Sequence, residues 1–155
     1  MTNVEKLLAI EDIKQLKARY CRAIDKKQWQ EWRNVFATDA VILMPEGTNP
    51  PHVAGIDAII EMVSTILEGA ITVHHLHAPE LTIIGETEAT GIWAMEDNLY
   101  WPTEKPNFFG AKHHYHGTGH YYEKYRKTPD GWRITEMAIP RLYEAADGVF
   151  ISRGM

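Results

Sequence analysis

The chain has 155 residues, of which 45% are hydrophobic and 24% charged, and its formal net charge is −5. This length and composition are typical of one globular domain and exclude a disordered or collagen-like chain. No basic cluster suits nucleic acid, and no apolar run is long enough to cross a membrane. The first ten residues lack a basic-then-apolar signal pattern, and the single cysteine, Cys21, excludes an intrachain disulfide. We therefore predict one domain over residues 1–155 in the cytoplasm, with neither nucleic acid nor membrane as a partner.

The first part of the chain has the spacing of helices. Apolar residues recur every three or four positions over residues 7–24, which predicts a long helix with Asn3 as its N-cap and no capping box. Shorter helices are predicted over residues 28–36 and 56–67. A short apolar strand is predicted between them, over residues 39–44.

For the rest of the chain, the pattern predicts strands separated by turns. We predict strands over residues 71–84, 89–101, 111–127 and 132–143, the first of them as one long strand or as two with a break at Pro79. Helices followed by antiparallel strands indicate an α+β domain. One curved sheet then has to wrap the long N-terminal helix.

Asp25 lies at the end of the predicted long helix, on the edge of its apolar face. If this carboxyl group is buried, its pKa rises toward that of a general base. The alternative is a solvated aspartate beside Lys26 and Lys27, which composition favours because aspartate is mostly exposed.

Two histidine clusters lie on predicted strands. On the first, His74 shares a strand face with Thr72, whereas His75 and His77 lie on the other face, so the three do not converge on one metal ion. Surface imidazoles are the favoured alternative, and no metal site is predicted. On the second, the face that carries His116 is equally consistent with a pocket and with the exterior.

The strand over residues 89–101 carries an acid on a face that is otherwise apolar. Trp93, Met95 and Asp97 share this face, and an acid there needs a partner or solvent. Asp97 is therefore either a pocket residue or a rim residue. Cys21, among apolar helix residues, is expected to be inert packing. The chain has neither a nucleophile elbow nor a nucleotide-binding glycine motif.

These motifs together resemble the SnoaL-like branch of the nuclear transport factor 2-like superfamily. The matching stretches are residues 18–27, 72–81, 91–97, 117–121 and 130–134. The resemblance extends over about residues 5 to 143. It implies a cone-shaped, mostly antiparallel sheet that wraps a long helix and two shorter ones around a deep apolar pocket. Relatives include scytalone dehydratase, bile-acid dehydratase, hexachlorocyclohexane dehydrochlorinase, steroid isomerase and polyketide cyclases.

The resemblance also implies catalytic residues. In the dehydratase and dehydrochlorinase relatives, a helix aspartate orients a strand histidine that takes a proton from carbon. Asp25 and His74 match these two positions, and Tyr20 matches a position that is tyrosine or lysine in relatives. A carboxylate that accepts from Nδ1–H would leave Nε2 of His74 as the base. Tyr20 or His116 would then donate to the substrate oxygen.

The implied pocket lining comes from two strands. If His74 points inward, Trp93, Met95 and Asp97 line the pocket beside it, and the last strand adds Met137 and Arg141. The dehydrochlorinase's pocket arginine falls on Met137, so this chain departs from that pattern. Whether Arg141 takes over that role is left open.

The sequence thus predicts a cofactor-independent lyase or isomerase of the dehydratase type. Its substrate would be a cyclic, largely apolar small molecule. The alternative is a non-catalytic small-molecule binder or an assembly subunit of the same fold. We also predict a homodimer or homotrimer that forms through the convex face of the sheet, where His75 and His77 would lie.

Overall fold

The structure, a computed structural model, describes residues 1–104 and 107–151, and in them three helices and eight strands form. The predicted α+β class is confirmed, and no helix of the described part has the length and apolarity needed to span a membrane. The elements are, in chain order, α1 (Asn3–Asp25), α2 (Trp29–Arg33), β1 (Phe36–Leu43), β2 (His52–Ala54), α3 (Ile56–Ile66), β3 (Ile71–Ile83), β4 (Glu88–Tyr100), β5 (His114–Thr128), β6 (Gly131–Ala138), β7 (Arg141–Ala146) and β8 (Val149–Phe150).

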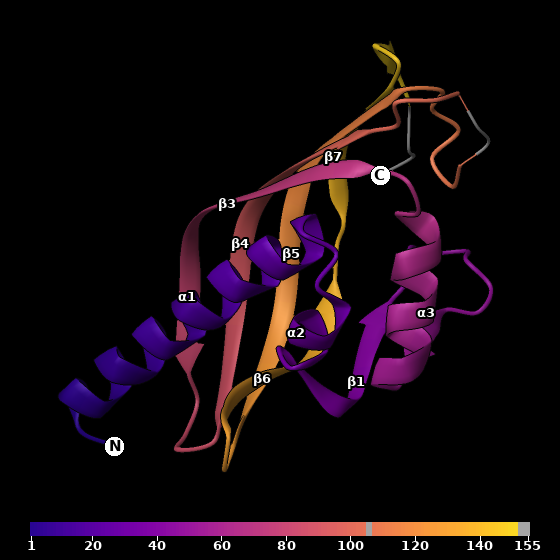
Figure 1. The fold of residues 1–155 in the computed structure, drawn as a ribbon. Coiled ribbons are helices and arrows are strands. Elements are labelled where there is room, and N and C mark those ends of the chain that lie inside the picture. Colours follow the sequence, from indigo (N-terminus) through magenta and orange to yellow (C-terminus); the bar gives the residue numbers. More distant parts are fainter. Residues whose placement is uncertain (105–106, 152–155) are drawn as a thin grey trace.

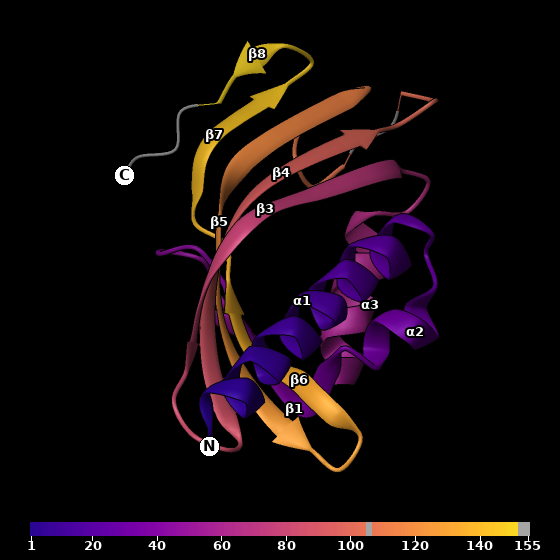
Figure 2. The same ribbon diagram turned by 90° about the vertical axis from the view of Figure 1, so that its left-hand side faces the viewer.

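The sheet is curved and does not close into a barrel (Figure 1). Its strand order is β2-β1-β6-β5-β4-β3, with β7 paired to β5 beyond β6 and β8 paired to β7. All pairs are antiparallel except β1 with β6. The three helices lie on the concave side, with α1 running across the sheet (Figure 2). No helix of the described residues covers the convex side of the sheet.

Helix α1 starts earlier than the apolar spacing predicted. Thr2 is the N-cap, and with Glu5 it forms a capping box, so the expectation of Asn3 as the N-cap without a capping box is wrong. Such a box satisfies two backbone N–H groups that a helix start leaves free. The helix buries Ile13, Leu16 and other apolar side chains against the sheet. It ends at Asp25, which places that carboxylate at the side of β3.

The predicted last strand, residues 132–143, is two strands. β6 ends at Ala138, and β7 begins at Arg141 after a break that contains Pro140. The break lets the chain leave β1 and pair with the far half of β5, where the register shifts between Thr118 and Gly119. A Cβ on Gly119 would lie 2.3 Å from the carbonyl oxygen of Pro140. The two segments approach so closely that only glycine fits at this position.

A buried ion pair lies under the middle of α1. The ammonium of Lys17 donates to Glu123 on β5 over 2.6 Å, and both side chains are 0% exposed. Glu123 also accepts a hydrogen bond from the hydroxyl of Tyr125. The ammonium stands 4.1 Å from the ring centres of both Tyr20 and Tyr121. This cluster fixes α1 to β5 at the floor of the space between helix and sheet.

Candidate active site

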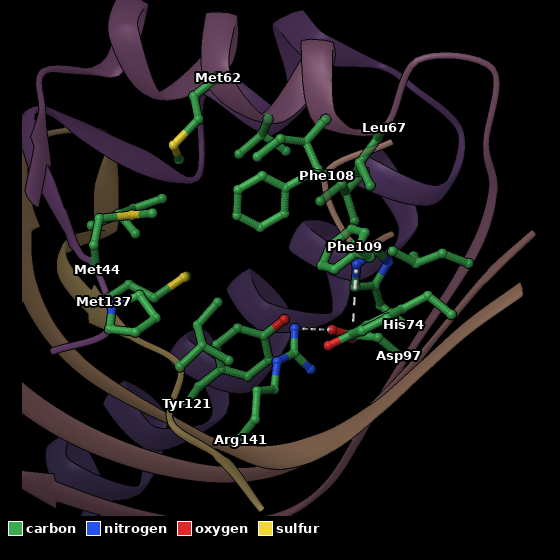
Figure 3. A pocket seen from close by; sticks show the side chains of 18 of the residues that line it. Met44, Met62, Leu67, His74, Asp97, Phe108, Phe109, Tyr121, Met137 and Arg141 are labelled. Atoms are coloured by element: carbon green, nitrogen blue, oxygen red, sulfur yellow. Dashed lines mark ion pairs between the residues drawn. The ribbon is translucent and has the colours of Figure 1, made fainter. Parts of the chain in front are cut away.

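A cavity of about 560 Å³ opens between the helices and the concave face of the sheet. His74, Asp97 and Arg141 lie together at one end of it, and most of the remaining wall is apolar (Figure 3). The described residues that line it are Tyr20, Ile24, Trp32, Ile42, Leu43, Met44, Pro45, Glu46, Thr48, Met62, Val63, Ile66, Leu67, His74, Asp97, Leu99, Phe108, Phe109, Tyr115, Tyr121, Met137, Ile139, Arg141 and Glu144.

The end of α1 and the start of β3 bring Asp25 and His74 together. Nδ1 of His74 lies 2.6 Å from Oδ1 of Asp25, and the backbone N–H of His74 donates to Oδ2 over 3.1 Å. The His74 side chain is 7% exposed and that of Asp25 is 25% exposed. With an ionised carboxylate at Nδ1, the imidazole carries its proton there and presents Nε2 as a hydrogen-bond acceptor. The two residues thus meet the distance that a base and its orienting group require.

Two further side chains hold the carboxylate of Asp25. The hydroxyl of Thr72 donates to its Oδ1 over 2.9 Å, and the ammonium of Lys27 donates to the Thr72 hydroxyl over 2.7 Å. Burial raises the pKa of Asp25, but the hydrogen bonds from His74 and Thr72 work against it, and the pKa lies below its usual value. Asp25 is therefore ionised at neutral pH. The alternative of a simply solvated aspartate beside two lysines does not describe this position.

A second ion pair faces His74 across the cavity end. Oδ2 of Asp97 lies 2.6 Å from a guanidinium nitrogen of Arg141, and Oδ1 lies 3.8 Å from Nε2 of His74. Oδ1 is buried and has no hydrogen-bond partner within the described residues. Burial lowers the pKa of Arg141, but Asp97 outweighs it and raises the pKa above its usual range, so the guanidinium stays charged. Arg141 also donates to the sulfur of Met95 over 3.2 Å.

Two tyrosines complete the polar end of the cavity. Tyr20 comes from α1 and Tyr121 from β5, and their rings meet edge to face with centroids 5.9 Å apart. Burial raises the pKa of each phenol well above its usual value, although a hydrogen bond from Tyr121 works against this at Tyr20. Both phenols therefore stay protonated and remain donors across the physiological pH range.

The structure places most of the predicted site residues at this cavity. Tyr20, His74, Asp97, Met137 and Arg141 line it, and Asp25 supports His74 from behind.

Three residues predicted to line the cavity do not. The indole N–H of Trp93 donates to Tyr125 over 2.8 Å, next to the buried ion pair, and Met95 lies behind Arg141. His116 faces the convex side, where its Nε2 lies 3.4 Å from a carboxylate oxygen of Glu96. The sheet curves so strongly that one strand face spans both the cavity and the packed core. Trp93 therefore lies in the packed core although it shares a strand face with Asp97, which lines the cavity.

Sequence reasoning missed Tyr121 and the support of Asp25 by Thr72 and Lys27. A signal existed for two of them. Thr72 is on the same strand face as His74. Tyr121 is on the same face of its strand as Gly117 and Gly119, which approach β7. No sequence pattern indicated the role of Lys27. Its side chain reaches Thr72 because its own backbone is left-handed, with φ of 56°.

Cys21 carries the single thiol of the chain. Burial raises the pKa of the Cys21 thiol to about 12, so it is not a thiolate at neutral pH. Among the residues that the structure describes, no group of three or more His, Cys, Asp and Glu side chains is arranged for a metal ion.

Solved structures of known proteins share this architecture. A scytalone dehydratase-like protein from Novosphingobium aromaticivorans is 17% identical, with a TM-score of 0.78 over 99% of this chain and 100% of that one. A hexachlorocyclohexane dehydrochlorinase of type 2 is 14% identical, with a TM-score of 0.77 over 99% of this chain and 100% of that one. The fold is that of the nuclear transport factor 2-like superfamily.

Within this class, the chain belongs to the SnoaL-like domain family, which matches residues 5–138. A protein named as a probable cyclase from Gibberella zeae is 29% identical over 140 residues, which cover 84% of this chain and 89% of that protein. The names of these three relatives are those of enzymes that process small molecules: a cyclase, a dehydratase and a dehydrochlorinase.

Proposed function

We propose that this chain is a cofactor-independent lyase or isomerase of the dehydratase type, in which His74 takes a proton from carbon. The observation that carries the proposal is the 2.6 Å contact between Nδ1 of His74 and Asp25, in a ring that also lines the cavity. An imidazole oriented in this way exposes an unprotonated Nε2 to a bound molecule. The enzyme names of the relatives support the same reaction class.

The first step is the removal of a proton next to a carbonyl group. Nε2 of His74 takes the proton, and the electron pair of the C–H bond moves toward the carbonyl oxygen as an enolate. Asp25 stabilises the imidazolium that forms, in the orienting role that carboxylates have in catalytic triads. Donors preorganised at the developing negative charge lower the barrier of such a step. Tyr20 is the donor that we assign, since its buried hydroxyl stays protonated.

The second step is elimination or isomerisation. In elimination, the enolate electrons form a carbon–carbon double bond as a hydroxyl group leaves from the neighbouring carbon. The proton held on Nε2 of His74 joins this hydroxyl, so water is released and the imidazole returns to its starting form. In isomerisation, the same proton returns to a different carbon. His116, predicted as a second donor, faces away from the cavity and has no part in these steps.

A β-hydroxytetralone tests the proposal, because it loses water to give naphthol, whose absorbance reports the rate. The wild-type protein is expected to accelerate this loss, and His74→Ala to lower the rate by about 100-fold or more, the usual contribution of a general base. Asp25→Asn is expected to lower it as well while the fold is kept. His52→Ala is the matched control, because it removes an exposed histidine that does not line the cavity.

Two results would contradict the proposal. One is a His74→Ala variant that keeps the wild-type rate, and the other is a wild-type protein without effect on the hydroxytetralone. In the second case, proton exchange in D₂O on unsubstituted tetralones separates the two steps. If exchange depends on His74, the assignment of His74 as the base stands, and only the elimination step is contradicted. No exchange at all would leave the chain a small-molecule binder.

We further propose self-association through the convex face of the sheet. Exposed Tyr122 lies there, the ring of His116 meets that of Tyr143 edge to face, and the Tyr143 ring contacts that of Phe150 with tilted planes. Aromatic side chains are enriched at interfaces. Light scattering at micromolar concentration is expected to give a dimer or trimer, and a monomer would contradict the proposal.

A further inference from the structure

The imidazole of His74 lies between two carboxyl groups. Oδ1 of Asp25 is 2.6 Å from Nδ1, and Oδ1 of Asp97 is 3.8 Å from Nε2 (Figure 3 shows His74 beside Asp97). The Asp97 oxygen is buried and has no hydrogen-bond partner within the described residues, so a small shift of the ring would bring the two atoms within hydrogen-bond distance. A neutral imidazole carries one ring proton, and the hydrogen bond that holds this proton sets the tautomer.

Only one of the two tautomers can serve as a base toward the cavity. With the proton on Nδ1, the unprotonated Nε2 faces the space where a ligand binds. With the proton on Nε2 and directed at Asp97, the lone pair lies on Nδ1 and faces Asp25 instead. The proposed reaction therefore requires that Asp25 holds the ring proton in preference to Asp97.

Two donors in series hold the carboxylate of Asp25 in place. The hydroxyl of Thr72, which is only 4% exposed, donates to Oδ1 over 2.9 Å, and the ammonium of Lys27 donates to this hydroxyl over 2.7 Å. An ammonium group has no acceptor, so it uses a lone pair of the Thr72 oxygen and leaves the single hydroxyl proton for Asp25. Within the described residues, the other hydrogen bonds of this carboxylate come from His74 itself. Thr72 is thus the support that does not depend on the ring.

The backbone of Lys27 has an unfavourable conformation that brings its ammonium to Thr72. Lys27 directly follows Lys26, the C-cap of α1, and its φ of 56° is left-handed. Glycine is the usual residue at such a position, because a Cβ crowds the neighbouring carbonyl oxygen there. Lys27 also binds a helix-end carbonyl, that of Ile24, but over 3.3 Å, a longer contact than the one to Thr72. A helix end alone therefore does not account for a lysine here.

We propose that Thr72 and Lys27 are positioning residues that select the reactive tautomer of His74. They hold the carboxylate of Asp25 at Nδ1 and so keep the ring proton away from Asp97. The proposal rests on the proposed function for the role of Nε2, although the tautomer itself exists without any reaction. Neither Thr72 nor Lys27 is among the described residues that line the cavity, so both act through Asp25 and not on a bound molecule.

Nitrogen-15 NMR of histidine-labelled protein at slightly alkaline pH measures the tautomer directly, because protonated and unprotonated ring nitrogens have different shifts. Comparison with His74→Ala assigns the signals. We expect the wild-type ring to carry its proton on Nδ1. Thr72→Val keeps the side-chain shape without the hydroxyl, and the ratio of the two tautomers should move about tenfold toward Nε2–H, the low end of the effect of a hydrogen bond to a charged group. Thr72→Ser keeps the hydroxyl and should restore the wild-type ratio.

The two neighbouring lysines provide a matched pair of variants. Lys27→Met is expected to shift the tautomer in the same direction as Thr72→Val, whereas Lys26→Met changes an exposed side chain and should have no effect. Lys27→Gly separates positioning from a purely structural role. Glycine relieves the left-handed backbone, so the melting temperature should not fall, yet the tautomer should shift as in Lys27→Met. A lower melting temperature with a wild-type tautomer would instead make Lys27 a residue of the helix end and overturn its role.

Kinetics on the hydroxytetralone provide the second measurement. In Thr72→Val, kcat should fall in proportion to the lost Nδ1–H tautomer while KM stays unchanged, because both tautomers bind the substrate and only one reacts. An unchanged kcat despite a shifted tautomer would contradict the proposal. So would a wild-type ring protonated on Nε2, or a wild-type tautomer ratio in Thr72→Val. The NMR result does not need turnover, so failure of the reaction and failure of this inference can be told apart.

Discussion

Removal of Lys17 should expose how much the buried ion pair contributes to stability. Both partners are 0% exposed, and the ammonium lies 2.6 Å from the Glu123 carboxylate. Lys17→Met keeps most of the aliphatic stem but leaves Glu123 as a buried charge without its cation. Removal of one partner of such a pair costs about 3–5 kcal/mol of unfolding free energy. For a chain of this length, that loss lowers the melting temperature by roughly 6–20 °C.

Urea unfolding of a double-mutant cycle measures this effect. In Lys17→Met/Glu123→Leu neither charge of this pair remains, and only the hydroxyl of Tyr125 loses its acceptor, at about 1–3 kcal/mol. The double variant should therefore be more stable than Lys17→Met alone, although additive losses would predict the reverse. An unchanged midpoint in Lys17→Met, or strictly additive losses, would refute the reasoning.

Three more predictions concern single positions. Gly119→Ala should lower the unfolding free energy by about 1–3 kcal/mol in urea, because its Cβ would clash with the carbonyl of Pro140; an unchanged midpoint contradicts this. Three backbone N–H groups lower the pKa of Asp147 to about 2, so its stabilisation is complete above its unfolded pKa and is lost as the pH falls toward 2. A titration midpoint near 4 for the Asp147 carboxyl group, measured by NMR, would contradict this. Arg141→Met should cost about 3–5 kcal/mol and lower the melting temperature, because buried Asp97 loses its cation; wild-type melting would exclude this.

The helices were predictable from the sequence because apolar spacing determines which helix face is buried. Periodicity found α1 but missed its start, since Thr2 and Glu5 form a capping box through hydrogen bonds and not through burial. Asp25 and His74 were paired by resemblance, and their positions agree with it. The alternation of side chains along a strand could not have predicted this contact, because Asp25 lies on a helix and His74 on a strand.

The face of β5 could not be predicted, because both faces carry aromatic residues. Tyr115 and Tyr121 alternate with His116 and other imidazoles, so polarity gives no contrast between them. The glycines were the better indicator, since a strand face that touches another backbone excludes larger side chains. The burial of Lys17 could not be predicted for a different reason. A lysine on a helix is taken as exposed until a partner is known, and Glu123 is on a strand far along the chain.

The break between β6 and β7 has a consequence for the order of folding. Asp97 lies on β4, and its cation is Arg141, the first residue of β7. Strands β4, β5 and β6 pair with their neighbours in the chain, whereas β7 returns past β6 to reach β5. Pairing between distant segments is slower than pairing across short turns. If the cavity closed before β7 docks, Asp97 would be buried without a counter-charge. We expect the polar end of the cavity to form only once β7 has docked, so that a chain has no complete site for its ligand before that step.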